Sequence, residues 1–221
     1  MDKPPITPRP LPADAASILA AVEAKRGYLL PYHRMFADSA PALLQRYDAF
    51  YESLTLVPRV LTPVERETVW AGLLAAAREV HGFIHMKRAV KAGLTEADIV
   101  RAVAIAAATE SYATMRFSGE NWAAWTLPAA LEKAYLVMVE AVSGDLAPKL
   151  THLTALVCHA ARRERAGMTL HLRLAIEAGA VPGEICEGLS YLLLPCGGNT
   201  LIEAVSFWED AAREGLVPGP Y

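Results

Sequence analysis

The sequence repeats itself at a shift of 86 residues, and this duplication limits the folds open to the chain more than any other feature. The segment HMKRAVKAGLTEADIV (85–100) aligns with HLRLAIEAGAVPGEIC (171–186), with a histidine first in each and Ala-Gly at the same place. Because glycine adopts the left-handed conformation that ends helices without steric cost, each copy predicts a helix, a short turn and a second helix. The chain is therefore predicted to be internally duplicated.

Apolar residues recur at helical spacing almost throughout, and no segment alternates as a half-buried strand does. Thr62-Pro63-Val64-Glu65 has the pattern of a helix start: a hydroxyl N-cap, proline at the first position and glutamate three residues after the cap. Thr95 and Asp98 form a similar pair. The predicted helices cover about 13–26, 40–55, 62–77, 79–92, 95–112, 128–143, 147–163, 166–178, 182–194 and 199–214, with a less regular aromatic segment at 113–126. The predicted fold class is all-α.

These patterns divide the chain into an N-terminal extension with the first helix (1–25), a first repeat (26–126) and a second repeat (127–221). Apolar residues make up 53% and charged residues 20%, which is typical of a globular protein with a large core. The net charge of -3 gives no electrostatic reason to expect nucleic acid or an anionic membrane as a partner. With no apolar run of membrane-span or signal-peptide type, a cytoplasmic protein is expected.

The cysteines argue against dithiol chemistry. Cys158, Cys186 and Cys196 form no C-x-x-C pair. Cys158 and Cys186 are predicted to be small core residues of apolar helices, and Cys196 precedes a Gly-Gly turn.

An ordered set of motifs resembles the carboxymuconolactone decarboxylase and AhpD-like superfamily. In the first repeat the set consists of Arg66-Glu67, LLAAAR (73–78), His85, Ala89, Ala92-Gly93 and Ile99. The lead-in segment 26–54 is similar to that of AhpD-like proteins, and 149–179 is similar to the helix pair of the decarboxylase branch. The resemblance implies an AhpD-like helical fold present twice. Relatives with one repeat assemble as trimers or hexamers, so a homo-oligomer, a dimer or trimer, is expected.

The AhpD branch of this superfamily uses a glutamate, a C-x-x-C pair and a histidine. Those positions fall here on Glu67, Arg78, His81 and His85, so both cysteines are missing. A thiolate is the nucleophile in disulfide exchange and peroxide reduction, and arginine or histidine cannot replace it. AhpD-type peroxidase activity is therefore disfavoured.

The residues Glu67, His81 and His85 are the predicted catalytic group. The two histidines lie four apart, which predicts one helix face, and the superfamily's hairpin geometry would bring Glu67 to them. A neighbouring carboxylate would raise the pKa of an imidazole. The predicted function is a cofactor-independent lyase or isomerase acting on a small carboxylated or lactone substrate. His85 would be the general acid/base, Glu67 its orienting partner, and His81 a second proton carrier or a carboxylate binder.

Two alternatives remain open. Glu67, His81 and His85 could instead ligate zinc or iron, as two histidines and a carboxylate do in many metal sites. The histidines could also be hydrogen-bonded residues of a non-catalytic helical oligomer. Candidate substrate-binding residues are Trp70, Arg78, Tyr112 and Trp122, and packing in the core or an interface is the competing interpretation of the aromatic ones.

The second repeat offers His152, His159 and His171 as further candidates. His152 and His159 are seven apart and share a helix face, and His171 lies on the next predicted helix. The superfamily's glutamate position falls on His152 or Leu153, so the carboxylate is missing. The second repeat is therefore predicted to be a second or vestigial site, and the first repeat is favoured as the functional one.

Overall fold

The computed structural model describes residues 13–221, so the proline-rich start of the predicted N-terminal extension, 1–12, lies outside the described residues. No strand occurs between residues 13 and 221, and the all-α prediction is confirmed. None of the helices in this range is both long and apolar enough to cross a membrane. The chain forms two compact units, Met1–Val57 and Pro58–Tyr221.

The described part of the first unit, 13–57, contains three short helices. They are α1 (Ala13–Arg26), α2 (Pro31–Ser39) and α3 (Pro41–Tyr51), and a π-helical turn, Glu52–Leu56, follows α3. Proline at the first position of α2 and of α3 starts each helix where its missing N–H costs nothing. The core of the unit consists of Ala15, Leu19, Val22, Ala37 and Leu44. The helix predicted at 40–55 ends earlier, at Tyr51, because its last turn widens into the π-helical turn.

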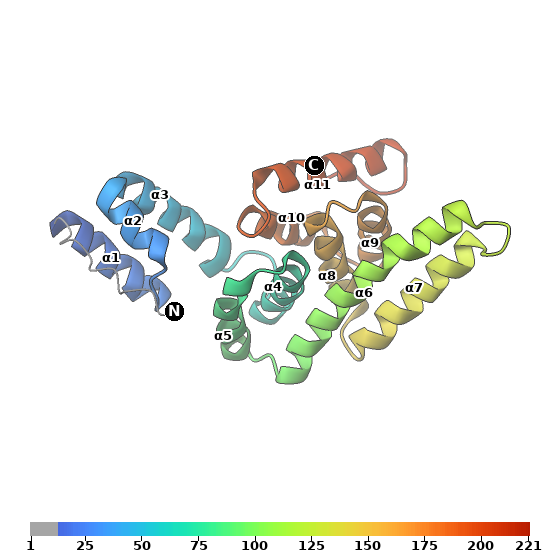
Figure 1. Cartoon of the computed structure of the whole chain (residues 1–221), viewed down its shortest axis with the longest axis horizontal. Coiled ribbons are helices and arrows are strands. Elements are labelled where there is room, and N and C mark those ends of the chain that lie inside the picture. The colour runs from blue at the N-terminus through green and yellow to red at the C-terminus, as the bar shows by residue number, and fades with distance from the viewer. Residues whose placement is uncertain (1–12) are drawn as a thin grey trace, which may run out of the picture. The chain divides into compact units, whose positions relative to one another are not determined.

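The second unit holds the remaining helices, which Figure 1 labels in chain order. They are α4 (Pro63–Ala77), α5 (Phe83–Ala92), α6 (Glu96–Asn121), α7 (Pro128–Ser143), α8 (Pro148–Ala161), α9 (Arg165–Glu177), α10 (Pro182–Ser190) and α11 (Gly198–Arg213), with 3-10 turns at Val80–Gly82 and Tyr191–Leu193. The predicted cap at Thr62 is confirmed, because its side chain accepts the N–H of Glu65 and its own N–H donates to the Glu65 carboxylate. Gly93 and Gly179 both adopt the left-handed conformation after their helices, as predicted.

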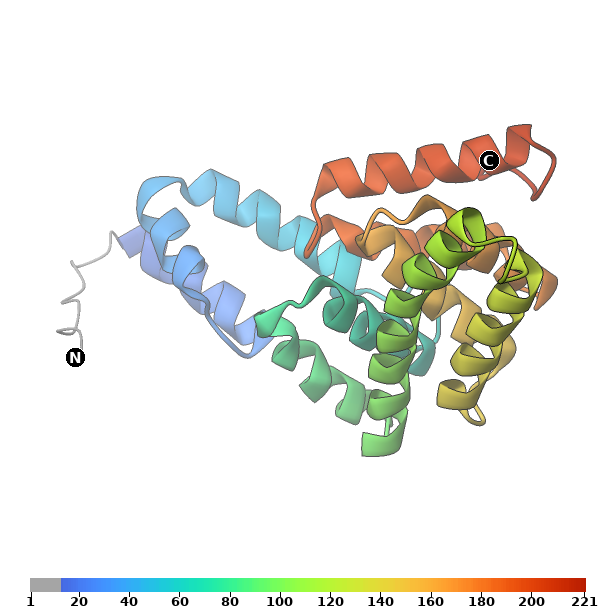
Figure 2. The same cartoon turned by 45° about the vertical axis from the view of Figure 1, so that its right-hand side comes forward.

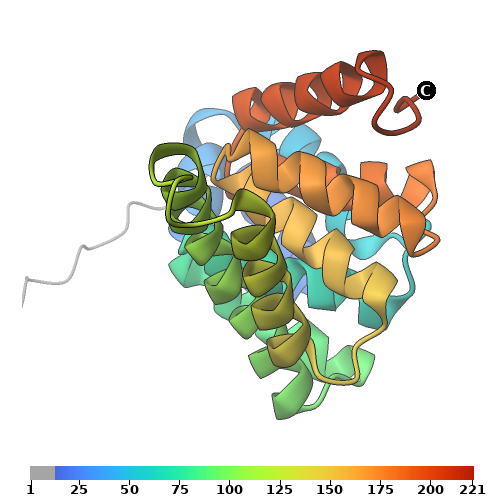
Figure 3. The same ribbon diagram turned by 90° about the vertical axis from the view of Figure 1, so that its right-hand side faces the viewer.

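The two repeats share one core. Helices α4 and α8, which correspond at the 86-residue shift, pack against each other, and α6 packs against α4 while forming an antiparallel hairpin with α7 (Figures 1 and 2). Helix α9 lies between α8 and α11, as Figure 3 shows. Gly72 makes the central contact possible, since a Cβ there would lie 2.4 Å from Cγ2 of Thr154 on α8. The boundary between the two compact units, after Val57, falls inside the predicted part 26–126, so the units do not coincide with the predicted parts 26–126 and 127–221.

Two further predicted helices have clearly different bounds in the structure. The helix predicted at 79–92 starts only at Phe83, because Arg78 takes a left-handed conformation (φ 55°) and the Glu79 side chain caps a separate 3-10 turn. The helix predicted at 95–112 continues to Asn121, through the segment predicted to be irregular. Helix α7 packs along this extension, and that packing stabilises it.

Candidate functional site

The first repeat buries a carboxylate in helix α4. The capped start of α4 places Glu67 one turn into the helix, where its side chain has no exposed surface. Its Oε1 lies 3.1 Å from Nε of Arg66, which offsets part of the cost of burying the charge. The other oxygen, Oε2, also needs a partner in so buried a place.

That partner is His85 on α5. Its Nδ1 lies 3.2 Å from Oε2 of Glu67. Its ring stacks on Trp70 with centroids 4.2 Å apart, and Tyr191 stacks on Trp70 at 4.5 Å. His85 is 6% exposed, whereas Glu67 and Trp70 are fully buried. The structure thus brings Glu67 and His85 together, and the imidazole is the member of the pair that reaches the surface.

Burial lowers the pKa of His85 below its usual 6.5, although the hydrogen bond and charge of Glu67 act in the opposite direction. Glu67 raises this pKa as expected, but desolvation is the larger effect, so the net shift is downward. A neutral imidazole that donates Nδ1–H to Glu67 leaves Nε2 as an acceptor. The pair is consequently arranged as a base that takes up a proton at Nε2, with Glu67 stabilising the imidazolium formed.

His81 lies apart from this pair. It falls in the exposed 3-10 turn before α5, where its N–H donates to the Glu79 carboxylate at 2.9 Å, so it does not share a helix face with His85. Across residues 13–221, no three histidine, cysteine or acidic side chains cluster in a way that could hold a metal ion. The three-ligand arrangement of Glu67, His81 and His85 is thus not formed.

Of the candidate substrate-binding residues, only Trp70 contacts the Glu67–His85 pair. The Arg78 side chain is 79% exposed and pairs with Glu110 at 3.0 Å. Trp122 is 51% exposed and contacts only Phe117 among the described aromatic rings. Tyr112 is buried against Tyr135 and His159 of the second repeat. The four residues therefore do not form one wall.

Sequence reasoning missed a contribution from the second repeat to the first site. Glu187 on α10 accepts the hydroxyl of Tyr191 at 2.6 Å and the N–H groups of Val60 and Leu61 at 2.6 and 2.8 Å. This carboxylate ties the segment before α4 to the tyrosine that supports Trp70. The one available signal was a glutamate on the helix 182–190, and it does not identify the partners.

In the second repeat, three histidines and one tyrosine lie within hydrogen-bond distance of one another in a row. The Tyr135 hydroxyl, on α7, lies 2.9 Å from Nε2 of His159 and 2.7 Å from Nε2 of His171. Nδ1 of His171 lies 3.1 Å from Nδ1 of His152. Tyr135, His159 and His171 are fully buried, and His152 is half-buried. We call these four residues the histidine–tyrosine chain.

Burial keeps the histidine–tyrosine chain uncharged. It lowers the pKa of His159 to about 3 and that of His171 well below 6.5, and it also lowers the pKa of His152. The pKa of Tyr135 is raised by the same desolvation. The chain is therefore a set of neutral groups at pH 7.

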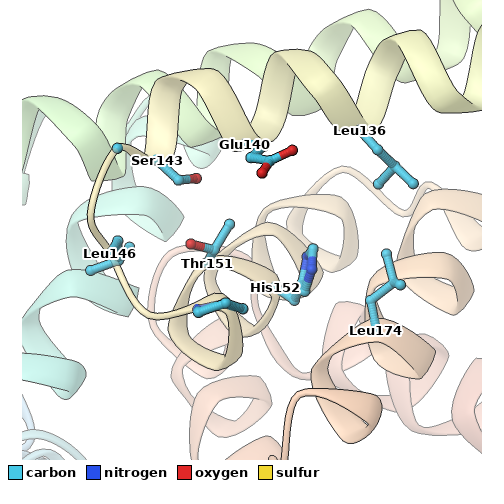
Figure 4. A pocket seen from close by; sticks show the side chains of 9 residues that line it. Leu136, Glu140, Ser143, Leu146, Thr151, His152 and Leu174 are labelled. Carbon is cyan, nitrogen blue, oxygen red and sulfur yellow. The ribbon is translucent and has the colours of Figure 1, made fainter.

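His152 also borders a cavity of about 290 Å³ between α7, α8 and α9. Figure 4 shows its ring among side chains that line this space. Glu140, Ser143 and Thr151 supply polar atoms, and Leu136, Leu146 and Leu174 supply apolar surface. The histidine–tyrosine chain therefore starts at a space large enough for a small molecule.

These features define a tandem pair of helical repeats, each built around a buried histidine at the same position. The carboxymuconolactone decarboxylase family matches the sequence twice, at residues 41–125 and 126–210, and the chain belongs to this family. No curated protein matches the chain.

Proposed function

We propose that the protein is a cofactor-independent lyase or isomerase that acts on a small carboxylated or lactone substrate at the Glu67–His85 pair. The observation that carries the proposal is the 3.2 Å contact between Oε2 of Glu67 and Nδ1 of His85, which commits one ring nitrogen and leaves Nε2 for the substrate. Membership of a family named for a lactone decarboxylase supports the substrate class.

The chemistry needs one proton and no external electron carrier. In isomerisation, Nε2 of His85 takes a proton from a carbon next to the lactone carbonyl and returns it to another carbon. In decarboxylation, the bond to the carboxylate breaks, its electron pair stays on the substrate carbon, and protonated Nε2 delivers a proton to that carbon. Glu67 stabilises the imidazolium in both reactions, and solvent restores the proton balance after decarboxylation.

Carboxymuconolactone is the first substrate to test, with loss of substrate and release of CO₂ as readouts. Glu67→Gln keeps the shape of the side chain and removes its charge, and we expect kcat/KM to fall about 10²-fold or more. His81→Gln is the matched control, because His81 lies outside the pair, and it should change the rate less than about twofold. Equal rates in the wild type and Glu67→Gln would exclude the proposed role of the pair.

The dimer or trimer expected from the sequence stays a prediction. Three exposed apolar side chains, Val80, Phe83 and Val90, lie on α5 and the turn before it. They are suited to contact with another subunit near His85.

A further inference from the structure

We propose that the second repeat holds a separate proton-transfer site, in which His152 is the base that faces the cavity and the histidine–tyrosine chain carries the proton to Glu164. The substrate class is an uncharged small molecule with a weakly acidic proton, such as one on the carbon next to a ketone. This site does not depend on the function proposed for Glu67 and His85.

The far end of the chain meets a carboxylate. Nδ1 of His159 lies 3.5 Å from Oε2 of Glu164, the residue that caps α9. This distance is longer than a hydrogen bond, and Nδ1 has no other partner among the described residues. The Glu164 side chain is 19% exposed and lies 3.8 Å from Nε of Arg116. A small movement of Glu164 would complete the path from the cavity to solvent.

The carboxylate fixes the direction of the hydrogen bonds. Neutral imidazole carries one N–H, and the Tyr135 hydroxyl carries one proton for two histidine neighbours. A negative charge at Glu164 favours the tautomer of His159 with its proton on Nδ1. Nε2 of His159 must then accept from Tyr135, and Tyr135 must accept from Nε2 of His171. The same reasoning puts the proton of His152 on Nδ1 and leaves its Nε2 free to accept.

Proton transfer along this path balances at every step. Nε2 of His152 takes the substrate proton, and Nδ1 of His152 gives its proton to Nδ1 of His171. Nε2 of His171 then gives its proton to the Tyr135 oxygen, and Tyr135 gives its own to Nε2 of His159. Nδ1 of His159 finally protonates Glu164. The substrate is left as its enolate and Glu164 becomes neutral, so no imidazole or phenol of the path keeps a net charge. A proton, or a deuteron taken up by Glu164 from D₂O, returns to the enolate carbon along the reverse path.

The cavity selects for an uncharged molecule. Its apolar surface comes from leucine side chains, and the carboxylate of Glu140 is the one formal charge among the residues that line it. A carboxylated substrate would meet repulsion there, since no cation lines the cavity to offset Glu140. An uncharged ketone could place its carbonyl near Ser143 or Thr151 and its acidic proton near His152.

A purely structural cluster gives a weaker account of the same atoms. Apolar side chains would fill the space without the desolvation cost of three imidazoles and a phenol. The cluster is also open at both ends, since His152 borders the cavity and Glu164 reaches solvent. A proton path needs both openings, whereas a packing role needs neither.

The first test uses cyclohexanone in D₂O, with exchange of its α-protons followed by NMR. The measurement is made in the His85→Gln background, so that the first site cannot contribute. We expect exchange above the buffer rate, and we expect His152→Gln to lower it at least tenfold. His152 is half-buried, so this variant should fold. His81→Gln in the same background is the matched control. Exchange at the buffer rate, or exchange insensitive to His152→Gln, would overturn the proposed base.

The second test examines the path itself. In ¹⁵N-histidine-labelled protein, ring-nitrogen NMR should show His159 and His152 protonated on Nδ1 and His171 on Nε2. Glu164→Gln removes the charge at the solvent end while keeping an oxygen for the α9 cap. We expect it to change the tautomer populations of His159 and of the distant His152, and to slow the exchange severalfold. Unchanged tautomers in Glu164→Gln would overturn the relay, because a packing role predicts no effect at that distance.

Discussion

The two repeats place a histidine at the same position and satisfy it in different ways. In the first repeat, the imidazole of His85 meets the charged carboxylate of Glu67. In the second, the imidazole of His171 meets only uncharged groups, His152 and Tyr135. Both rings are buried, and burial lowers the pKa of both. One scaffold therefore holds a histidine that tolerates protonation and another that does not.

The largest expected effect is acid destabilisation that originates in the second repeat. The pKa of His159 is lowered to about 3 from 6.5, so unfolding takes up a proton as the pH falls below about 6.5. The contribution of His159 to the free energy of unfolding is therefore complete above that pH and declines towards pH 3. The loss is about 2 kcal/mol between pH 6.5 and 4.5 for this histidine alone. Urea unfolding at a series of pH values measures it.

His159→Gln should flatten this pH dependence even if it lowers stability at pH 7, because the slope reports the titrating group. His81→Gln, at an exposed position, serves as the control and should leave the slope as in the wild type. A wild-type slope in His159→Gln would mean that the acid sensitivity lies elsewhere, and the contrast between the repeats would fail.

The next effect compares two buried tyrosines, one in each site. Tyr135→Phe removes a hydroxyl that serves both His159 and His171, and we expect a loss of roughly 2–3 kcal/mol in the free energy of unfolding. Tyr191→Phe removes a donor from Glu187, whose other oxygen keeps two backbone N–H groups, and roughly 1 kcal/mol should be lost. Thermal and urea unfolding give both values.

Tyr112→Phe supplies the matched control for that pair. Tyr112 is buried against Tyr135, and its hydroxyl has no hydrogen bond to a described residue. A change within about 0.5 kcal/mol is expected. If Tyr135→Phe cost no more than Tyr112→Phe, the bridging hydroxyl would contribute nothing to stability.

A third prediction concerns the pH–rate profile of the first site. Glu67 raises the pKa of His85 against the larger effect of burial, so Glu67→Gln should move the limb controlled by His85 to lower pH. The profile of kcat/KM measures this limb, since it reports ionisation of the free enzyme. His152→Gln should leave the limb in place. A limb that moves to higher pH in Glu67→Gln would contradict the assignment to His85.

Several helix boundaries could be predicted from the sequence because they depend on local signals, whereas the Glu67–His85 contact was expected only from the superfamily resemblance. Caps at Thr62 and Thr95 and the glycine after α5 are short-range patterns, and the structure keeps them. The break in the helix before α5 could not be predicted, because apolar residues continue at helical spacing through it. Gly82 lies at this break and packs closely against α4, since a Cβ at position 82 would lie 3.3 Å from Cβ of Leu74.

The histidine–tyrosine chain shows the same limit at longer range. Tyr135 is 24 residues from His159 and 36 from His171 in sequence, and nothing local indicates that they meet. Helix periodicity places His152 and His159 on one face, but it does not indicate that the phenol of Tyr135 contacts His159. Only the packing of α7 against α8 and α9 supplies that contact. The repeat therefore predicts the positions of His85 and His171 but not the groups that each one contacts.

The smallest expected effect belongs to Arg78, which aligns with a position that holds a cysteine in the AhpD branch. Its side chain is 79% exposed, and its ion pair with Glu110 lies in solvent. Arg78→Ala should therefore change kcat/KM less than about twofold and stability by less than about 1 kcal/mol. Lactone turnover and urea unfolding check the two values. A tenfold loss of rate would show that the end of α4 belongs to the first site, and the boundary drawn around Glu67, Trp70 and His85 would have to be widened.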